Sequence, residues 1–233
     1  MTLSLGATAN SSDRDVDVKP IANTQMQNLR YQNWVETRRQ LVDSLSNGRI
    51  AYLHVRAMNQ TALQLFKEQL VSIAESKDAM IVDVRENAGG SIAVHLLGML
   101  DRTPWLLRRF RDFPLVSENK YRSKAFERPQ ACLINGYSGS NAEIFAEGFR
   151  RHKLGPIVGT PTGSAVIGTA EYYLIDGAHI RRPSWGSFTL EMEDTDLVPR
   201  QPDIFIENLP DDLQAGRDPQ LVRAVAELMK SLK

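Results

Sequence analysis

Short apolar strands that alternate with amphipathic helices constrain the fold of this chain more than any other feature of its sequence. Four segments read as strands that are apolar on both faces, namely RIAYLHV (49–55), AMIVDVR (79–85), ACLIN (131–135) and GPIVGT (155–160). Helical spacing of apolar residues follows three of them, beginning at Asn59, after the glycine pair 89–90 and at about Asn141. Buried strands separated by helices are typical of a mainly parallel sheet with helical cover. The sequence therefore predicts an α/β core.

The two ends of the chain have a different pattern. Residues 1–24 predict a strand, a polar turn and a second strand closed by Pro20, and a helix follows from Asn28. Two strands cannot bury a face by themselves, so residues 1–24 look like the end of a domain whose body is missing, or strands added to a neighbour's sheet. Residues 25–233 form the expected core domain.

Toward the C-terminus, AEYYLIDGAHIRRPSW predicts two strands around an Asp-Gly turn. The last helix is expected to begin at Asp218 as the capping residue, with Pro219 in the first helical position.

Charge and cysteine content exclude several classes of protein. Basic and acidic residues number 28 each, so no excess charge favours nucleic acid or an anionic membrane. The single cysteine, Cys132, excludes an intrachain disulfide framework and reads as a small core residue. No histidine pair has metal-ligand spacing, and no apolar run approaches the ~18 residues that span a bilayer. The opening MTLSLGATAN is a poor signal peptide, which favours a cytoplasmic location.

The segment NGYSGSNAEIF (135–145) resembles a nucleophile elbow, but Ser140 stands where the second glycine would be. It joins a strand to a helix, and a helix N-terminus can stabilise an oxyanion with its unpaired N–H groups. Ser140 is adjacent to those groups, whereas Ser138 lies farther out in the loop. Ser140 and Glu143 equally fit a capping box. The local pattern therefore supports both a nucleophile and a helix cap.

A second glycine turn, DVRENAGGS, has the same ambiguity. Its glycines can expose backbone N–H groups to a carbonyl oxygen, or they can simply allow a tight turn from strand to helix. The two turns follow what look like neighbouring parallel strands, so they could face one crevice. One turn would then supply a nucleophile and the other an oxyanion donor, which raises the prospect of an acyl-transfer site.

The order of several segments resembles that of the tail-specific (C-terminal-processing) serine peptidases, most closely the catalytic core of their tricorn branch. The matching segments run over roughly residues 16–233: LRYQNWVETRR, GRIAYLHV, IVDVRENAGG, YSGSNAEIF, LGPIVGTPTGSAVIG, LIDGAHIRRP, QPDIFIENLP and GRDPQLVRAVAELMKSL. The resemblance implies a ClpP/crotonase-like core of strand–helix units. It also implies that residues 1–24 are the last strands of a truncated PDZ-like domain.

Carried over by position, the resemblance assigns roles to five residues. Ser140 matches the nucleophile, and the N–H of Asn141 matches one oxyanion donor, where the tricorn branch usually has aspartate. The other donor is a glycine of the second turn, Gly89 or Gly90, with Gly90 favoured. Asp196 matches the glutamate that helps to orient the histidine of the tricorn branch. The implied reaction is hydrolysis of peptides or unfolded proteins through an acyl-enzyme, without a cofactor or a metal; a homo-oligomer is left open.

Several departures from the family pattern favour an alternative. Ala165 occupies the position of the lysine base of the more distant processing peptidases, and the usual TWGG is replaced by residues 162–165. The tricorn-type histidine belongs to a region upstream of the PDZ domain, which we expect this chain to lack. Of the local histidines, His95 is the best substitute and His54 reads as structural. The alternative is an inactive peptide-binding or scaffolding pseudo-peptidase. A thioester-acting enzyme on the same fold has only analogy in its favour.

Overall fold

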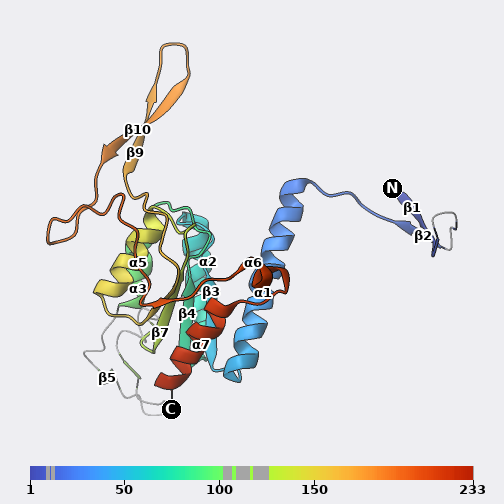
Figure 1. The fold of residues 1–233 in the computed structure, drawn as a ribbon, viewed down its shortest axis with the longest axis horizontal. Helices are drawn as coiled ribbons and strands as arrows, with labels where there is room; N and C mark the ends of the chain where they lie inside the picture. Colours follow the sequence, from blue (N-terminus) through green and yellow to red (C-terminus); the bar gives the residue numbers. More distant parts are fainter. Residues whose placement is uncertain (9–10, 12–13, 102–106, 109–115, 118–125, 233) are drawn as a thin grey trace. The chain divides into compact units, whose positions relative to one another are not determined.

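The computed structural model describes residues 1–8, 11, 14–101, 107–108, 116–117 and 126–232. It divides the chain into two compact units, residues 1–38 and residues 39–233, which are described separately (Figure 1). The division falls inside one helix. The expected boundary between a PDZ-like remnant, residues 1–24, and the core domain, residues 25–233, is a different division and stays a prediction.

Unit 1 contains the predicted pair of strands. Strands β1 (Thr2–Leu5) and β2 (Arg14–Asp17) pair antiparallel, and a side-chain hydrogen bond joins Thr2 to Asp17 across the pair. Helix α1 (Asn23–Ser46) begins five residues before the expected start at Asn28. Its first turn is exposed, and Met26 is its only apolar residue before Asn28, so no apolar periodicity marked this turn in the sequence.

Unit 2 is built on a parallel sheet of five strands in the order β11-β8-β7-β4-β3, which confirms the α/β prediction. Strands β4 and β7, predicted from AMIVDVR and ACLIN, are interior strands and direct neighbours. The five strands are β3 (Ile50–His54), β4 (Ala79–Asp83), β7 (Gln130–Ile134), β8 (Ile157–Gly159) and β11 (Ile204–Phe205).

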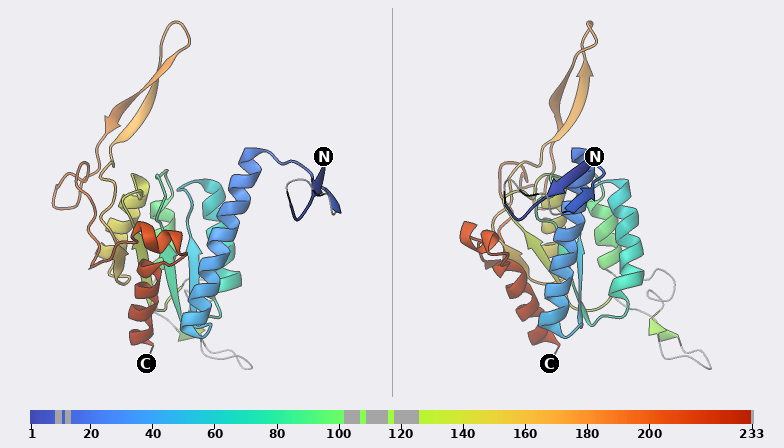
Figure 2. Two further views of the ribbon diagram at one scale, coloured as in Figure 1. Left: turned by 45° about the vertical axis from the view of Figure 1, so that its right-hand side comes forward. Right: turned by 90° about the vertical axis from the view of Figure 1, so that its right-hand side faces the viewer.

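Helices cover both faces of this sheet (Figure 2). One face packs against α2 (Gln60–Gln69), the π-helical turn η1 (Leu70–Ala74), α3 (Ala93–Leu100) and α5 (Asn141–Arg151). The other face packs against α7 (Pro219–Ser231), whose buried residues contact β7 and β8. The caps predicted for α2 and α7 are confirmed, because Asn59 and Asp218 each accept a hydrogen bond from a first-turn N–H. Cys132, on β7, is fully buried as predicted.

Smaller elements complete the unit. Strand β11, helix α6 (Pro210–Gln214) and the two-stranded pair of β5 (Leu107–Arg108) and β6 (Val116–Ser117) were not predicted from the sequence. The hairpin expected around the Asp-Gly turn is present as β9 (Gly168–Tyr173) and β10 (His179–Trp185), a two-stranded ribbon that stands apart from the parallel sheet (Figure 1). In the described part of the chain, no helix is both long and apolar enough to cross a bilayer.

A buried charge cluster fixes α7 to the sheet, and nothing in the sequence pattern indicated it. The Arg85 guanidinium bonds to Asp83 at 2.6 Å and to Asp218 at 2.8 Å, and all three side chains are buried. Tyr52 donates a further hydrogen bond to Asp83 at 2.7 Å. Burial by itself lowers the pKa of Arg85, but the charges of Asp83 and Asp218 outweigh it and raise that pKa. His54, read as structural, is buried with Nε2 2.9 Å from the Arg85 carbonyl oxygen.

Candidate active site

The two serines of the loop after β7 have different surroundings, and this difference separates their roles. Ser138 is fully buried; its hydroxyl donates to the Val84 carbonyl oxygen at 2.8 Å and accepts from the Asn135 N–H at 3.0 Å. Ser140 is half-buried, and in the described part of the chain its hydroxyl forms no hydrogen bond. Ser138 is therefore a structural residue of the loop, and Ser140 is the serine whose hydroxyl is available for chemistry.

Ser140 stands at the N-terminus of α5, as predicted, but it is not an ordinary cap. Its φ and ψ of 53° and −119° lie outside the β-region typical of capping residues. A non-glycine residue in this region is strained, and such strain concentrates at functional sites. Half of the predicted capping box is present, because Glu143 Oε2 accepts from the Ser140 N–H at 2.8 Å. The hydroxyl forms no capping hydrogen bond, because the Glu143 N–H donates to the Ser140 carbonyl oxygen at 2.9 Å. The cap hypothesis therefore accounts for Glu143 but not for the Ser140 side chain.

The glycine turn after β4 lies directly against Ser140. A methyl group placed on Gly89 would lie 2.6 Å from the Ser140 Cβ and 3.0 Å from the Asn141 nitrogen. The loops are held together by the Gly139 N–H, which donates to the Asn87 carbonyl oxygen at 2.9 Å. The two turns at the carboxyl ends of neighbouring strands thus face one site, as the sequence predicted.

Hydrogen bonding distinguishes the candidate oxyanion donors. The Gly89 N–H is occupied, because it donates to Asn87 Oδ1 at 2.9 Å. The N–H groups of Gly90 and Asn141 form no hydrogen bond in the described residues. The Asn141 side chain is used elsewhere, since its Oδ1 accepts from the Ala93 N–H at 2.8 Å and so ties α3 to α5. The pair Gly90 and Asn141 is therefore the better candidate for holding an oxyanion.

Glu143 organises this site, a role beyond the capping that its sequence position suggested. Its carboxylate is fully buried and accepts four hydrogen bonds. Oε2 binds the N–H groups of Ser140 and Ala165, and Oε1 binds the Ser164 N–H and the Thr162 hydroxyl, at 2.7 to 2.9 Å. The carboxylate therefore joins the Ser140 turn to the loop 162–167. The partners in that loop lie about twenty residues away, so no local signal could have revealed them.

Asp196 is hydrogen-bonded to the far end of the loop 162–167. Its Oδ1 accepts from the N–H groups of Val166 and Ile167 at 2.8 and 3.0 Å. The hydrogen bond from Val166 is the main reason why the pKa of Asp196 lies below its ordinary value, so the group is ionised at neutral pH. No side chain of the described chain pairs with this carboxylate, whose interactions are with backbone N–H groups. Asp196 thus connects to Ser140 through the loop 162–167 and Glu143, without touching it.

No histidine of the described chain forms a hydrogen bond with Ser140. His95 is exposed on α3, and His152 pairs with Asp101 at the end of α5. His179 belongs to the hairpin, where it lies 4.0 Å from Glu171. No group of acidic, histidine or cysteine side chains among the described residues has the arrangement of a metal site.

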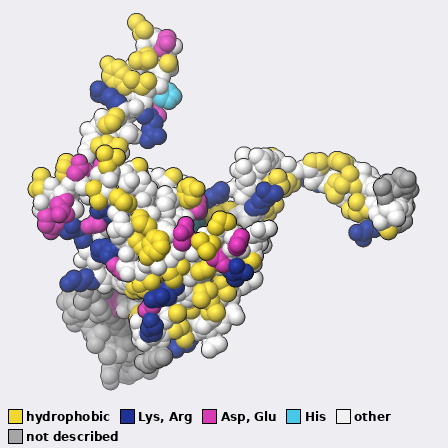
Figure 3. All heavy atoms as spheres, in the orientation of Figure 1, with side chains coloured by type: hydrophobic (Ala, Val, Ile, Leu, Met, Phe, Trp, Pro, Cys, Tyr) yellow, Lys and Arg dark blue, Asp and Glu magenta, His cyan; other side chains and the backbone are white. Residues whose placement is uncertain are grey.

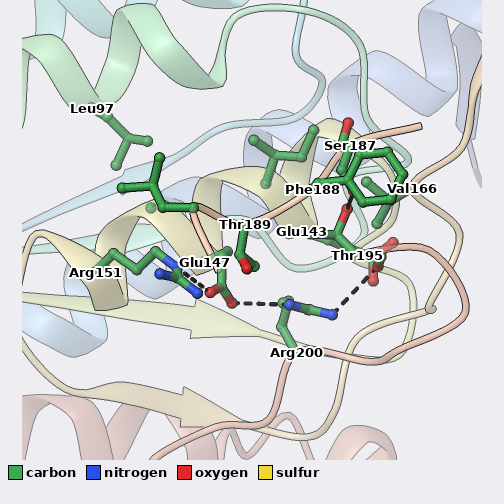
Figure 4. A pocket seen from close by; sticks show the side chains of 13 residues that line it. Leu97, Glu143, Glu147, Arg151, Val166, Ser187, Phe188, Thr189, Thr195 and Arg200 are labelled. Atoms are coloured by element: carbon green, nitrogen blue, oxygen red, sulfur yellow. Dashed lines mark hydrogen bonds and ion pairs between the residues drawn. The ribbon is translucent and has the colours of Figure 1, made fainter. Parts of the chain in front are cut away.

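A cavity of about 280 Å³ lies beside the site, along one side of α5 (Figure 4). Leu97, Ile144, Val166 and Phe188 give it mainly apolar walls, and Glu143 borders it.

Three charged residues that line this cavity are paired with one another, whereas Glu143 is bonded to backbone N–H groups and a hydroxyl. Glu147 lies between Arg151 and Arg200 (Figure 4). Burial alone raises the pKa of Glu147, but the hydrogen bonds from the two arginines outweigh it and lower that pKa. The rest of the cavity wall is mainly apolar.

A methyl group on Gly89 tests how closely the two turns must approach. Gly89→Ala is expected to cost ~1–2 kcal/mol for its φ of +104° and a further ~1–3 kcal/mol for the overlap with Ser140. The matched control is Gly177→Ala, at a φ of +84° with open space around it, which pays only the first cost. Denaturant unfolding of the two variants and the wild type measures the difference. Equal losses in both variants would mean that the turns are not in contact.

Comparison with protein-family models matches residues 49–206 to Peptidase_S41, described as peptidase family S41. Among curated proteins, a tricorn protease of Thermoplasma volcanium is 32% identical over 213 residues, which are 88% of this chain and 20% of that protein. Tricorn protease homolog 1 of Streptomyces coelicolor is 33% identical over 229 residues, 94% of this chain and 20% of that protein. The chain spans about a fifth of the length of these relatives.

Solved structures give the same fold. The crystal structure of the tricorn protease matches with a TM-score of 0.82 and 28% identity over 96% of this chain and 22% of that chain. The photosystem II D1 C-terminal processing protease matches with a TM-score of 0.52 over 76% of this chain and 46% of that chain; its 23% identity supports the fold alone.

Proposed function

Because this chain belongs to peptidase family S41, we propose that it is the catalytic core of a serine peptidase in which Ser140 attacks the peptide bond. One observation carries the assignment of the nucleophile. Ser140 has an available hydroxyl on a strained backbone at a helix N-terminus, directly against a glycine turn. The other serine of the loop is buried with its hydroxyl bonded.

In this mechanism the Ser140 Oγ forms a bond with the carbonyl carbon, and its proton passes to a general base. The carbonyl oxygen becomes an oxyanion held by the N–H groups of Gly90 and Asn141. Collapse of the intermediate breaks the C–N bond, and the leaving amine takes the proton. Water then hydrolyses the ester on Ser140 and returns the enzyme. No step requires a metal or a cofactor.

The general base is proposed to be a histidine that a longer chain or another copy brings to Ser140. Asp196 would orient that histidine, since its carboxylate is ionised and no side chain of the described chain pairs with it. The proposed substrates are peptides or unfolded proteins, cleaved as an endopeptidase or an oligopeptidase.

Peptide binding without hydrolysis is the second candidate function. It is favoured by Ala165 at the lysine position, and by the fact that no histidine or lysine of the described chain is bonded to Ser140.

A fluorophosphonate probe tests the proposal on the 233-residue chain. Without a base, Ser140 should be modified slowly, and peptide turnover should lie ~10⁴- to 10⁶-fold below that of a complete triad. Added imidazole should speed the modification, because it supplies the missing base. Peptide mapping by mass spectrometry identifies the labelled serine, and a fluorogenic peptide reports turnover.

Each other outcome of this experiment is informative. Modification at Ser138, or none even with imidazole, would contradict a nucleophilic Ser140, and the second of these would favour binding alone. Rapid cleavage by this chain would show that a local base acts, with His95 the first residue to replace.

A further inference from the structure

The β9–β10 hairpin, residues 168–185, has one polar and one apolar face; we call it the arm. Its register places Glu171 opposite Arg181 and Tyr172 opposite Ile180, so successive residues alternate between the faces. Side chains of the polar face form hydrogen bonds with one another. Tyr173 donates to Glu171 at 2.9 Å, and Arg181 Nη2 donates to the Thr169 hydroxyl at 2.8 Å.

The apolar face of the arm is uncovered. Tyr172 and Ile180 are each 52% exposed, and Trp185 is 59% exposed although its ring lies against Gly168. Arg182 stands on this face with its guanidinium 5.0 Å from the centre of the Tyr172 ring. Arg182 has no ion pair in the described part of the chain. Two-stranded ribbons are marginally stable alone, and contiguous apolar surface usually marks an interaction site. The arm therefore has the character of a docking element.

The loop that follows the arm carries the opposite charge. Residues 187–195, the acidic loop, form a closed turn in which the Thr189 N–H donates to the Glu193 carbonyl oxygen at 2.9 Å. At its tip Leu190 is 94% exposed and Met192 is 75% exposed. Glu193 has no ion pair among the described residues. Figure 3 shows basic and apolar side chains along the arm, and acidic side chains gathered beside apolar ones at the loop. The arm carries Arg182 and the loop carries Glu193, so the two surfaces have opposite charges. Both surfaces also expose apolar side chains.

The arm cannot reach the acidic loop of its own chain. Only Gly186 separates Trp185, at the base of the arm, from the loop. Ile180 lies five residues farther along the strand, about 16 Å away at the usual rise of ~3.3 Å per residue. The middle of the arm is thus directed away from the loop that could complement it. A second copy of the chain can present its loop there.

We propose that the arm of one copy docks its apolar face on the acidic loop of a second copy, and that the second arm docks reciprocally about a two-fold axis. A two-fold contact uses the same surface on both copies, so the pair of Arg182 and Glu193 occurs twice. A buried aromatic side chain removes ~150–250 Å² from water. Tyr172 and Trp185 are each about half exposed, so the aromatic side chains of two arms and the more exposed loop tips together approach the ~1,200 Å² of a stable interface.

Charge reversal on each surface gives a test that only two copies can satisfy. Arg182→Glu and Glu193→Arg should each place like charges in both contacts and raise the dimer dissociation constant about tenfold or more. Mixing the two variants should restore a mixed dimer. In that dimer one of the two contacts pairs the original Arg182 with the original Glu193, and the other pairs the two reversed side chains, so both contacts join opposite charges. Sedimentation velocity of the 233-residue chain measures the dissociation constants.

Arg181→Glu is the matched control, since it makes the same change one residue away on the polar face and should leave dimerisation within about twofold. Circular dichroism confirms that each variant is folded. A wild-type chain that stays monomeric up to its solubility limit would overturn the proposal. So would a dimer that neither reversal weakens, or variants that fail to recover when mixed.

Discussion

Replacing Ser140 by alanine is expected to abolish labelling by a fluorophosphonate probe and to leave the stability of the fold almost unchanged. The hydroxyl makes no hydrogen bond in the described structure, so its loss leaves no buried group unpaired. In a protein that supplies the general base, the same replacement should lower peptide turnover ~10⁴- to 10⁶-fold, because the covalent intermediate cannot form. Intact-mass spectrometry and denaturant unfolding measure the two effects.

Ser138→Ala is the matched control and should show the reverse. It removes the donor to Val84 and the acceptor from Asn135 inside the core, which should cost about 1–3 kcal/mol of unfolding free energy. Labelling of Ser140 should persist in the folded fraction. If Ser140→Ala keeps its label while Ser138→Ala loses it, the assignment of the nucleophile is wrong. A large loss of stability in Ser140→Ala would restore the helix-cap hypothesis.

The second large effect concerns the buried cluster around Arg85. Arg85→Met should cost about 3–5 kcal/mol, since it leaves the carboxylates of Asp83 and Asp218 buried without their cation. Asp218 also caps α7, so the loss should loosen that helix first. Chemical denaturation gives the free energy, and hydrogen exchange of α7 amides tests where the loss acts.

Arg223→Met provides the comparison, because Arg223 pairs with Glu227 on the surface of α7 and is 42% exposed. Exposed pairs contribute ~0–1 kcal/mol, so this variant should remain close to the wild type. Similar losses in the two variants would mean that the Arg85 cluster is solvated in solution and does not hold α7.

Four of the five strands of the parallel sheet could be predicted from the sequence because each is marked locally; β11 and the order of the strands were not predicted. AMIVDVR and ACLIN are apolar on both faces, which only an interior strand satisfies. Helix ends with a capping residue, such as Asn59 and Asp218, were equally clear. The start of α1 was wrong, since its first turn is solvated and carries no apolar stripe.

The site could be predicted only in part because its decisive contacts are distant in sequence. The choice between Ser138 and Ser140 depends on Val84, 54 residues from Ser138, and on the backbone angles of Ser140. Gly90 is preferred over Gly89 as oxyanion donor because the Gly89 N–H already donates to the Asn87 side chain. The Arg85 cluster joins residues 133 positions apart. Periodicity carries no information on such pairs. The local pattern predicted a helix N-terminus after Ser140, which is confirmed, whereas the role of Ser140 as nucleophile came from the resemblance to a family and stays a prediction.

The single thiol of the chain, on the central strand of the sheet, can measure how often that sheet opens. Cys132 is fully buried on β7, and burial, with the negative charges of Asp83 and Asp203, raises the pKa of its thiol. Only the thiolate reacts with alkylating reagents, so the native protein should resist them almost completely. Alkylation then proceeds only when the sheet opens, and its rate counts those openings. The alkylation rate of the wild-type chain therefore measures its excursions from the native state, with no residue replaced.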